Sequence, residues 1–342
     1  MEAAQIRIAA VGTALPDPPI DNAALARRFG MNQLWEQWVD GFIGTRTRHL
    51  AVDLETGRQR FRLADLAETA ARKAMESASV DALDVDVLVM STATPDQLMP
   101  TTCNVVADRL GIDGIPTYQI QSGCSGAVQS LELASTILRG GQCRTALVVG
   151  GDVCAKYWDA DAELKKMPPG EMVNRVLFGD GAGAAVLTTE PLAGAPVLRA
   201  TTTRLVGLGR APGQILEWFG IADRDGRAPV VEDYKAIEEL IPAMAGEVLD
   251  ELLDQLDWPL DDLDFILPPQ LSGRMTERIV GQLPPMSAHR VNCVAETGNI
   301  GNGLPYLQLE RLVDEIDPGH RAIGIAVESS KWISAGYAVE GS

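Results

Sequence analysis

Short, fully apolar runs separated by helical patterns are the feature that most constrains the fold of this chain. Residues 86–91 read Asp-Val-Leu-Val-Met-Ser and residues 146–150 read Ala-Leu-Val-Val-Gly. Such runs are typical of strands that are buried on both faces of a sheet. Alanines and leucines recur at spacings of three and four over residues 63–79 and 127–138, which predicts helices there. This alternation continues to about residue 189 and predicts a mostly parallel α/β layer.

The second half of the chain contains the same kinds of element after a long connection. Residues 190–231 are rich in Gly, Pro and Arg, so we expect a connection with irregular strands there. A long helix with an irregularity at Pro242 is expected over residues 237–256. The remaining expected elements are strands at 265–268, 322–327 and 336–339 and helices at 276–283 and 304–316. We therefore predict two units, residues 1–189 and 190–342.

Composition narrows the classes of protein to which the chain can belong. A net charge of −18 argues against general binding to nucleic acid or to an anionic membrane, which requires clustered Lys and Arg. No apolar run reaches the length of a membrane span, and the first residues do not resemble a signal peptide. The five cysteines are scattered and lack metal-ligand spacing. We expect no metal site and a cytoplasmic location.

Cys124 lies between an expected strand, residues 117–120, and the helical pattern that begins near Ala127. A thiol at a helix N-terminus meets unpaired N–H groups that favour the thiolate. Gly123 and Gly126 would allow a tight turn and a close approach by substrate. Taken alone, this stretch fits a catalytic nucleophile and a small buried cysteine equally well.

Four segments together resemble the ketoacyl-acyl-carrier-protein synthase III family of the thiolase superfamily. Residues 93–103 resemble a segment that crosses the dimer interface, and Ser122-Gly-Cys-Ser-Gly-Ala resembles the nucleophile elbow. Residues 177–187 match a glycine-rich signature loop, and Gly298-Asn299 resembles a second catalytic turn. Their order and spacing are more specific than any one of them, and the resemblance extends over essentially the whole chain.

This resemblance implies an α/β thiolase fold, five-layered α-β-α-β-α, with two pseudo-equivalent halves in a homodimer. It also implies that Cys124 carries an acyl group that is delivered by the phosphopantetheine of an acyl-carrier protein or by coenzyme A, with no other cofactor. The Cys124 N–H would form half of an oxyanion hole. A thiolate accepts an acyl group from a thioester readily, and aligned N–H donors stabilise the tetrahedral oxyanion.

The chain departs from the family where the catalytic histidine is expected. The matching residues are Pro268-Pro269-Gln270-Leu271-Ser272, with Pro269 at the histidine position. Proline offers neither a base nor a hydrogen-bond donor, so efficient decarboxylation is not expected. None of the three histidines (His49, His289 and His320) falls in a motif that would replace it. Gln270 or water as a stand-in, and Glu296 as a replacement base, stay open.

Residues near the expected entrance bear on the acyl donor. Trp38 matches a family tryptophan that grips the coenzyme A nucleotide, but Phe42 replaces the arginine beside it. This change favours a carrier protein, whose pantetheine lacks the nucleotide. Alternatively, Phe42 packs under Trp38 and Arg46 or Arg48 supplies the charge. Arg274 occupies the position of a docking arginine, and Arg278 and Arg290 are further candidates for contact with an acidic carrier protein.

Two further positions concern the acyl pocket. The late loop Glu328-Ser-Ser-Lys-Trp332 replaces a family run of glycines, and a Ser330 N–H would complete the oxyanion hole. Met99 stands where an aromatic residue often reaches across the dimer to the pocket. Methionine suits a differently shaped acyl group, although ordinary interface packing explains it equally well.

These features favour an acyltransferase that moves an acyl group, aromatic groups included, from a carrier protein through Cys124. The acceptor would be a hydroxyl or amine of a small natural-product intermediate. Asn299 would be the remaining carbonyl donor. The first alternative is a decarboxylative condensing enzyme of fatty-acid or polyketide initiation. The second is a non-catalytic partner subunit.

Overall fold

The computed structural model describes residues 4–158, 164–167, 169–216 and 230–342. Its main sheet has ten strands in the order β12-β11-β13-β14-β8-β1-β7-β6-β4-β5. The N-terminal five are β1 (Ile6–Ala14), β4 (Val87–Ser91), β5 (Thr117–Ile120), β6 (Thr145–Val153) and β7 (Asp180–Thr188). The C-terminal five are β8 (Val197–Leu205), β11 (Phe265–Leu267), β12 (His289–Arg290), β13 (Arg321–Glu328) and β14 (Ile333–Glu340).

The two sets of five strands have the same topology. In the first, β1 and β6 flank β7 in antiparallel fashion, and β4 lies parallel to both β6 and β5. In the second, β8 and β13 flank β14 in antiparallel fashion, and β11 lies parallel to both β13 and β12. Only a short pairing of Ile6 and Arg7 with Val197 and Leu198 joins them. The chain thus contains two pseudo-equivalent halves, although the division at residue 189 as a folding boundary stays a prediction.

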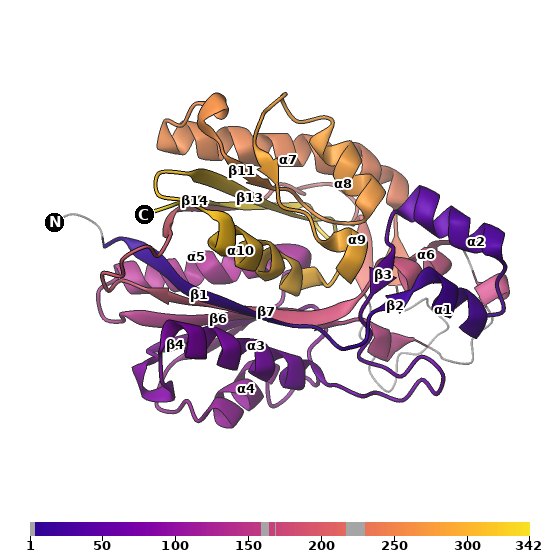
Figure 1. Ribbon diagram of the computed structural model, residues 1–342, viewed down its shortest axis with the longest axis horizontal. Coiled ribbons are helices and arrows are strands. Elements are labelled where there is room, and N and C mark those ends of the chain that lie inside the picture. The colour runs from indigo at the N-terminus through magenta and orange to yellow at the C-terminus, as the bar shows by residue number, and fades with distance from the viewer. Residues whose placement is uncertain (1–3, 159–163, 168, 217–229) are drawn as a thin grey trace.

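Helices cover and separate the two sets of strands in five layers (Figure 1). The outer layers are α3 (Leu63–Ala78) with α4 (Thr102–Leu110), and α7 (Tyr234–Leu256) with α8 (Gly273–Val280). Between the two sets of strands lie α5 (Gly126–Arg139) and α10 (Leu304–Glu315). Helix α3 lies close to β1, since a Cβ added at Gly12 of β1 would lie 2.6 Å from the Ala70 carbonyl oxygen. The absence of a side chain at Gly12 allows this close approach. This arrangement confirms the predicted thiolase-type α/β layers.

A smaller unit on one side of the layers carries part of the site. It contains β2 (Ile20–Asp21), α1 (Asn22–Arg28), α2 (Gln33–Trp38), the π-helical turn η1 (Val39–Ile43), β3 (Thr47–Arg48) and α6 (Pro169–Leu177). The remaining short elements are η2 (Ala82–Asp84), η3 (Gly123–Ser125), η4 (Ala155–Tyr157), η5 (Leu164–Lys166), β9 (Gln214–Leu216), β10 (Val230–Glu232), η6 (Leu260–Asp262), α9 (Val294–Thr297) and η7 (Gly301–Gly303).

Two elements differ from the sequence-based expectation. Residues 197–205, expected to be irregular, form a regular strand at the junction of the halves. Threonines on this strand tolerate a partly exposed face, which hides the apolar signal used to predict strands. The expected helix at residues 276–283 begins earlier, at Gly273, because the Ser272 side chain accepts a hydrogen bond from the Met275 N–H and caps it.

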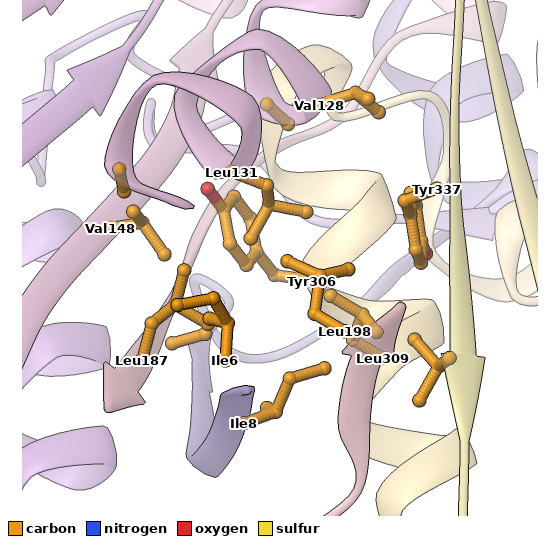
Figure 2. Close-up of a cluster of buried hydrophobic side chains, with 14 of the residues drawn as sticks. Ile6, Ile8, Val128, Leu131, Val148, Leu187, Leu198, Tyr306, Leu309 and Tyr337 are labelled. Atoms are coloured by element: carbon orange, nitrogen blue, oxygen red, sulfur yellow. The ribbon is translucent and has the colours of Figure 1, made fainter. Parts of the chain in front are cut away.

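The core between the two halves is a continuous apolar cluster (Figure 2). Leu131 of α5 and Tyr306 of α10 lie in it, among side chains from β1, β6, β7 and β8. Both are fully buried. Because α5 and α10 pack against both sets of strands, they fix the relative positions of the strand ends at which the site is built.

We predict that Leu131→Ala lowers the free energy of unfolding by roughly 2–5 kcal/mol, because it leaves a cavity in this central layer. The matched control is Leu83→Ala, since Leu83 is 96% exposed, and it should change stability by less than about 0.5 kcal/mol. Urea unfolding followed by fluorescence measures both. Equal effects for the two variants would contradict this assignment of the core.

Candidate active site

Cys124 lies in the predicted elbow between strand and helix. β5 ends at Ile120, Cys124 is the middle residue of η3, and α5 begins at Gly126. Gly123 has a φ of +50°, a left-handed conformation that favours glycine. The residue is half-buried and lines a cavity.

The Cys124 N–H donates a hydrogen bond of 2.5 Å to Oε2 of Glu328, at the end of β13. The Ser330 N–H donates one of 2.7 Å to Oε1 of the same carboxylate. Glu328 is only 2% exposed, and a Cβ added at Gly123 would lie 1.9 Å from its Oε2. The absence of a side chain at Gly123 is therefore what makes room for this carboxylate.

This arrangement corrects the predicted oxyanion hole. The two N–H groups assigned to it, those of Cys124 and Ser330, bind the two different oxygens of the Glu328 carboxylate. The carboxylate satisfies both donors, so they are not open to a substrate oxyanion while Glu328 stays in place. In the sequence, Glu328 is visible only as the first residue of the loop that replaces a family run of glycines.

The acidity of Cys124 also differs from the expectation. Burial, followed by the negative charges of Glu328 and Asp152, raises the pKa of the Cys124 thiol well above its ordinary value. The prediction that the helix N-terminus lowers this pKa was wrong. The N–H that would have stabilised the thiolate is bound to a carboxylate, and a carboxylate beside the sulfur opposes a second negative charge.

Asn299 lies in the same cavity wall as Cys124 and Glu328. Its backbone is fixed between the Leu177 carbonyl oxygen and the Gly179 N–H, at 2.9 and 3.1 Å. Its side-chain Oδ1 accepts a hydrogen bond of 3.0 Å from the Gly301 N–H. The amide NH₂ is therefore the group that Asn299 can offer to a substrate carbonyl.

Pro269 is buried in the same wall, next to Gln270. The Gln270 Oε1 accepts hydrogen bonds of 2.8 and 2.7 Å from the N–H groups of Cys293 and Val294, and its Nε2 donates to Val291. The amide thus holds the loop before α9. The second N–H of the Gln270 amide has no described partner, so its role as a stand-in for the missing histidine stays a prediction.

Other proton-accepting candidates lie away from the thiol. His49 is buried against the Pro16 carbonyl oxygen, while His289 and His320 flank Phe265. Glu296 forms ion pairs with Arg46 and Arg311 on the surface. None of these four lines the cavities described next.

Two cavities meet at Cys124. The first, of about 300 Å³, opens past Phe42, Arg274 and Arg278. The second, of about 150 Å³, is lined by Tyr157, Trp158 and Phe178 and also reaches the thiol. Both reach Glu328. Cys124 thus lies in the lining of both cavities.

The entrance supports the packing alternative for Phe42. Its ring stacks on Trp38, with centroids 6.5 Å apart, and is 72% exposed. The cations suggested as substitutes are both engaged. Arg46 pairs with Glu296 at 2.5 Å, and fully buried Arg48 donates to backbone carbonyls. Arg274 and Arg278 lie exposed at the entrance, whereas Arg290 lies on the edge strand β12 and does not line the cavity.

Met99 does not line either cavity of this chain. It is 86% exposed, and neighbouring Leu98 is 60% exposed. Two exposed apolar side chains in sequence are consistent with a segment that contacts another protein surface. The role of Met99 in a partner's pocket stays a prediction.

Glu328 and Asp152 are the two site residues that sequence reasoning missed. Asp152 is buried and accepts hydrogen bonds from Thr92, Ala93, Thr94 and Asn302. It ties the end of β6 to η7 beside Asn299. The available signal was an acidic residue directly after a run of apolar strand residues, as in Ile325-Ala-Val-Glu328.

We predict that Glu328→Gln lowers the pKa of the Cys124 thiol, because it removes the nearest negative charge. Alkylation of Cys124 by iodoacetamide, followed by peptide mass spectrometry across pH, should then begin at lower pH than in the wild type. Glu296→Gln is the control, since Glu296 is exposed and distant from the thiol, and its profile should match the wild type. A midpoint that stays unchanged or rises in Glu328→Gln would contradict this account.

Comparison with known proteins agrees with the fold and with the elbow. Residues 118–204 match the family model described as 3-oxoacyl-[acyl-carrier-protein (ACP)] synthase III. The beta-ketoacyl-[acyl-carrier-protein] synthase III of Neisseria meningitidis serogroup C is 28% identical over 86% of this chain and 85% of its own.

Solved structures extend the similarity to the whole chain. The 3-oxoacyl-(acyl carrier protein) synthase III of Pseudomonas aeruginosa PAO1 aligns with a TM-score of 0.83 and 25% identity, covering 98% of each chain. The protein described as AbyA1, a tetronic acid condensing enzyme, aligns with a TM-score of 0.96 and 59% identity, covering 98% of this chain and all of its own. This chain belongs to the ketoacyl-acyl-carrier-protein synthase III family of condensing enzymes, with the thiolase fold.

Proposed function

We propose that this protein transfers an acyl group from an acyl-carrier-protein thioester, through a thioester on Cys124, to a hydroxyl or amine of a natural-product intermediate. The observation that carries the proposal is the position of the Cys124 thiol where two cavities meet. One cavity can admit the donor arm while the other holds the acyl group or acceptor. No cofactor beyond the donor's pantetheine is included in this proposal.

The residue at the histidine position supports transfer without decarboxylation. Pro269 lines the cavity but provides no donor for a thioester carbonyl. Of the two residues that donate hydrogen bonds to the thioester carbonyl in the family, a histidine and an asparagine, only the asparagine is present here, as Asn299. Loss of one such donor typically costs about 10²–10³ in rate, which affects formation of a carbanion more than transfer to a hydroxyl.

The entrance supports a carrier protein rather than coenzyme A as the donor. Arg274 and Arg278 present positive charge beside the opening of a chain whose net charge is −18. An acidic carrier protein would meet this local charge. Arg48 is unsuited to clamp the phosphates of a nucleotide because it is buried, and Arg46 lies in a surface ion pair with Glu296 and does not line the cavity.

The similarity to a tetronic acid condensing enzyme suggests a class of acceptor. A tetronic acid ring is a five-membered lactone, so its formation requires an ester C–O bond as well as C–C bonds. Acyl transfer to a hydroxyl forms the ester bond. We therefore favour as acceptor a small hydroxylated intermediate that itself carries a reactive carbonyl group.

A second candidate function is C–C condensation at the same cysteine. It is favoured by the 59% identity to a protein described as a condensing enzyme. The two functions differ in product, since an ester or amide is cleaved by mild alkali or hydroxylamine, whereas a new C–C bond is not. A catalytically inert subunit would form neither product.

We also propose that the protein works as a homodimer through the segment that carries Leu98 and Met99. The edge strand β5 lies at the end of the sheet, and its Tyr118 is 42% exposed. An edge strand with exposed apolar residues is a template for pairing with another chain.

Among the helices that the structure describes, none is long and apolar enough to cross a membrane.

Incubation with acylated carrier protein should add one acyl mass to the wild-type chain, measured by intact-mass spectrometry. Cys124→Ala should abolish the adduct, because it removes the sulfur that forms the thioester. Cys143→Ala is the matched control, since Cys143 is also half-buried but lines neither cavity, and it should keep the adduct. Absence of any adduct on the wild type, with every donor tested, would refute the proposed function.

The double substitution Leu98→Asp and Met99→Asp should shift the protein from dimer to monomer in sedimentation velocity, because it places charge at the proposed interface. Leu83→Asp, on another exposed apolar residue, should leave the assembly unchanged. A double variant that sediments like the wild type would argue against this interface.

A further inference from the structure

We propose that Glu328 is the general base of the transfer step, in place of the histidine that Pro269 replaces. This inference rests on the proposed Cys124 acyl-enzyme and adds the group that moves the proton. The nucleophilic hydroxyl of an acceptor is far too weakly acidic to attack a thioester without a base near it. A carboxylate placed beside the sulfur can supply that base.

The position of Glu328 is built into the fold rather than chosen by a flexible side chain. Its two oxygens accept hydrogen bonds from the backbone N–H groups of Cys124 and Ser330, at 2.5 and 2.7 Å. Gly123, with its φ of +50°, leaves the space that the carboxylate fills. A base held by two backbone donors and by the Ser330 side chain keeps its orientation through the reaction.

Other carboxylates near the thiol are already engaged. Asp152 accepts five hydrogen bonds, at distances of 2.8–3.0 Å, and so has no free acceptor position. Glu232 accepts from Tyr234 and Gln214, and Glu238 pairs with Arg278 at the entrance. Among the described residues that line the two cavities, Glu328 is the carboxylate that hydrogen-bonds Cys124, through its N–H and through its side chain.

The charge state of Glu328 suits this task. Burial raises its pKa above the ordinary value, and nearby Asp152 raises it further, while the N–H groups of Ser330 and Cys124 oppose the shift. A base whose pKa lies nearer to neutrality accepts a proton more readily and still ionises. The charged or titratable residues nearest to it are Cys124 and Asp152. The cavities that it lines also contain Cys154, Tyr157, Arg175, Glu232 and Tyr234.

Glu328 and Cys124 together account for every proton that moves in the transfer step. The acceptor hydroxyl attacks the acyl carbon, its proton passes to the Glu328 carboxylate, and a C–O bond forms. The C–S bond to Cys124 then breaks with its electron pair on sulfur, and the protonated Glu328 returns the proton to that sulfur. The raised pKa of the Cys124 thiol makes this return favourable. With the backbone N–H groups occupied, the Asn299 amide is the donor that remains for the acyl oxygen.

The test separates formation of the acyl-enzyme from its discharge. Wild type and Glu328→Gln are acylated with octanoyl-N-acetylcysteamine, freed of excess donor, and followed by intact mass in water, in glycerol and in hydroxylamine. Hydroxylamine attacks thioesters without a base, so it should discharge both proteins at similar rates. Discharge by water and by glycerol should be slower in Glu328→Gln by about 10²–10⁴, the usual contribution of a general base.

The pH profile provides a readout that a merely structural role would not change. Wild-type discharge by water should rise with pH as Glu328 ionises and then level off, whereas Glu328→Gln should lack this rise. Glu328→Asp, which keeps a carboxylate on a shorter side chain, should recover part of the rate. If Glu328→Gln does not fold, the wild-type profile still decides, because a rate independent of pH across the ionisation of Glu328 would overturn the proposal.

The outcomes also separate this inference from the proposed function. A wild type that forms no adduct refutes the Cys124 acyl-enzyme itself. An adduct that both proteins discharge to water and glycerol at equal rates overturns only the role of Glu328. A Glu328→Gln protein that alkylates normally but cannot be acylated would support a role for Glu328 as a base, since the same carboxylate takes the Cys124 proton when the acyl-enzyme forms. The wild-type pH profile of discharge then decides the transfer step.

Discussion

The carboxylate of Glu328, bound by the N–H groups of Cys124 and Ser330, is the interaction on which the site depends. After burial, which is the larger cause, its negative charge raises the pKa of the Cys124 thiol. It also takes the backbone donors that would otherwise hold an oxyanion. The loss of the family histidine at Pro269 and the gain of this glutamate are therefore best understood together, as one exchange of proton acceptor.

The pseudo-symmetric fold explains how residues 204 positions apart meet at this point. Cys124 follows β5 in the first half, and Glu328 ends β13 in the second. The apolar layer formed by α5 and α10 lies between the two sets of strands and sets their separation (Figure 2). Asp152 adds a polar tie from β6 to η7, next to Asn299. The groups to which we assign catalysis are thus supplied by both halves and positioned by the packing between them.

Much of the fold could be predicted from the sequence, because buried strands and amphipathic helices leave a strong apolar pattern. The partly polar strand β8 was missed as a regular element, since its threonines weaken that pattern. Cys124, Asn299 and the substitution at Pro269 were found through short motifs. Glu328 was not, because its importance lies in contacts with two distant backbone groups. The acidity of Cys124 was predicted in the wrong direction for the same reason, since the helix N-terminus was visible in the sequence and the opposing carboxylate was not.

The most direct test of this account is a crystal structure of the protein with an acyl group trapped on Cys124 at neutral pH. The account predicts that Glu328 still accepts hydrogen bonds from the Cys124 and Ser330 N–H groups, and that the acyl oxygen faces the Asn299 amide. An acyl oxygen bound to those two N–H groups, with the Glu328 side chain displaced, would contradict it. In that case the two backbone donors would form an ordinary oxyanion hole, and Glu328 would only occupy it in the free protein.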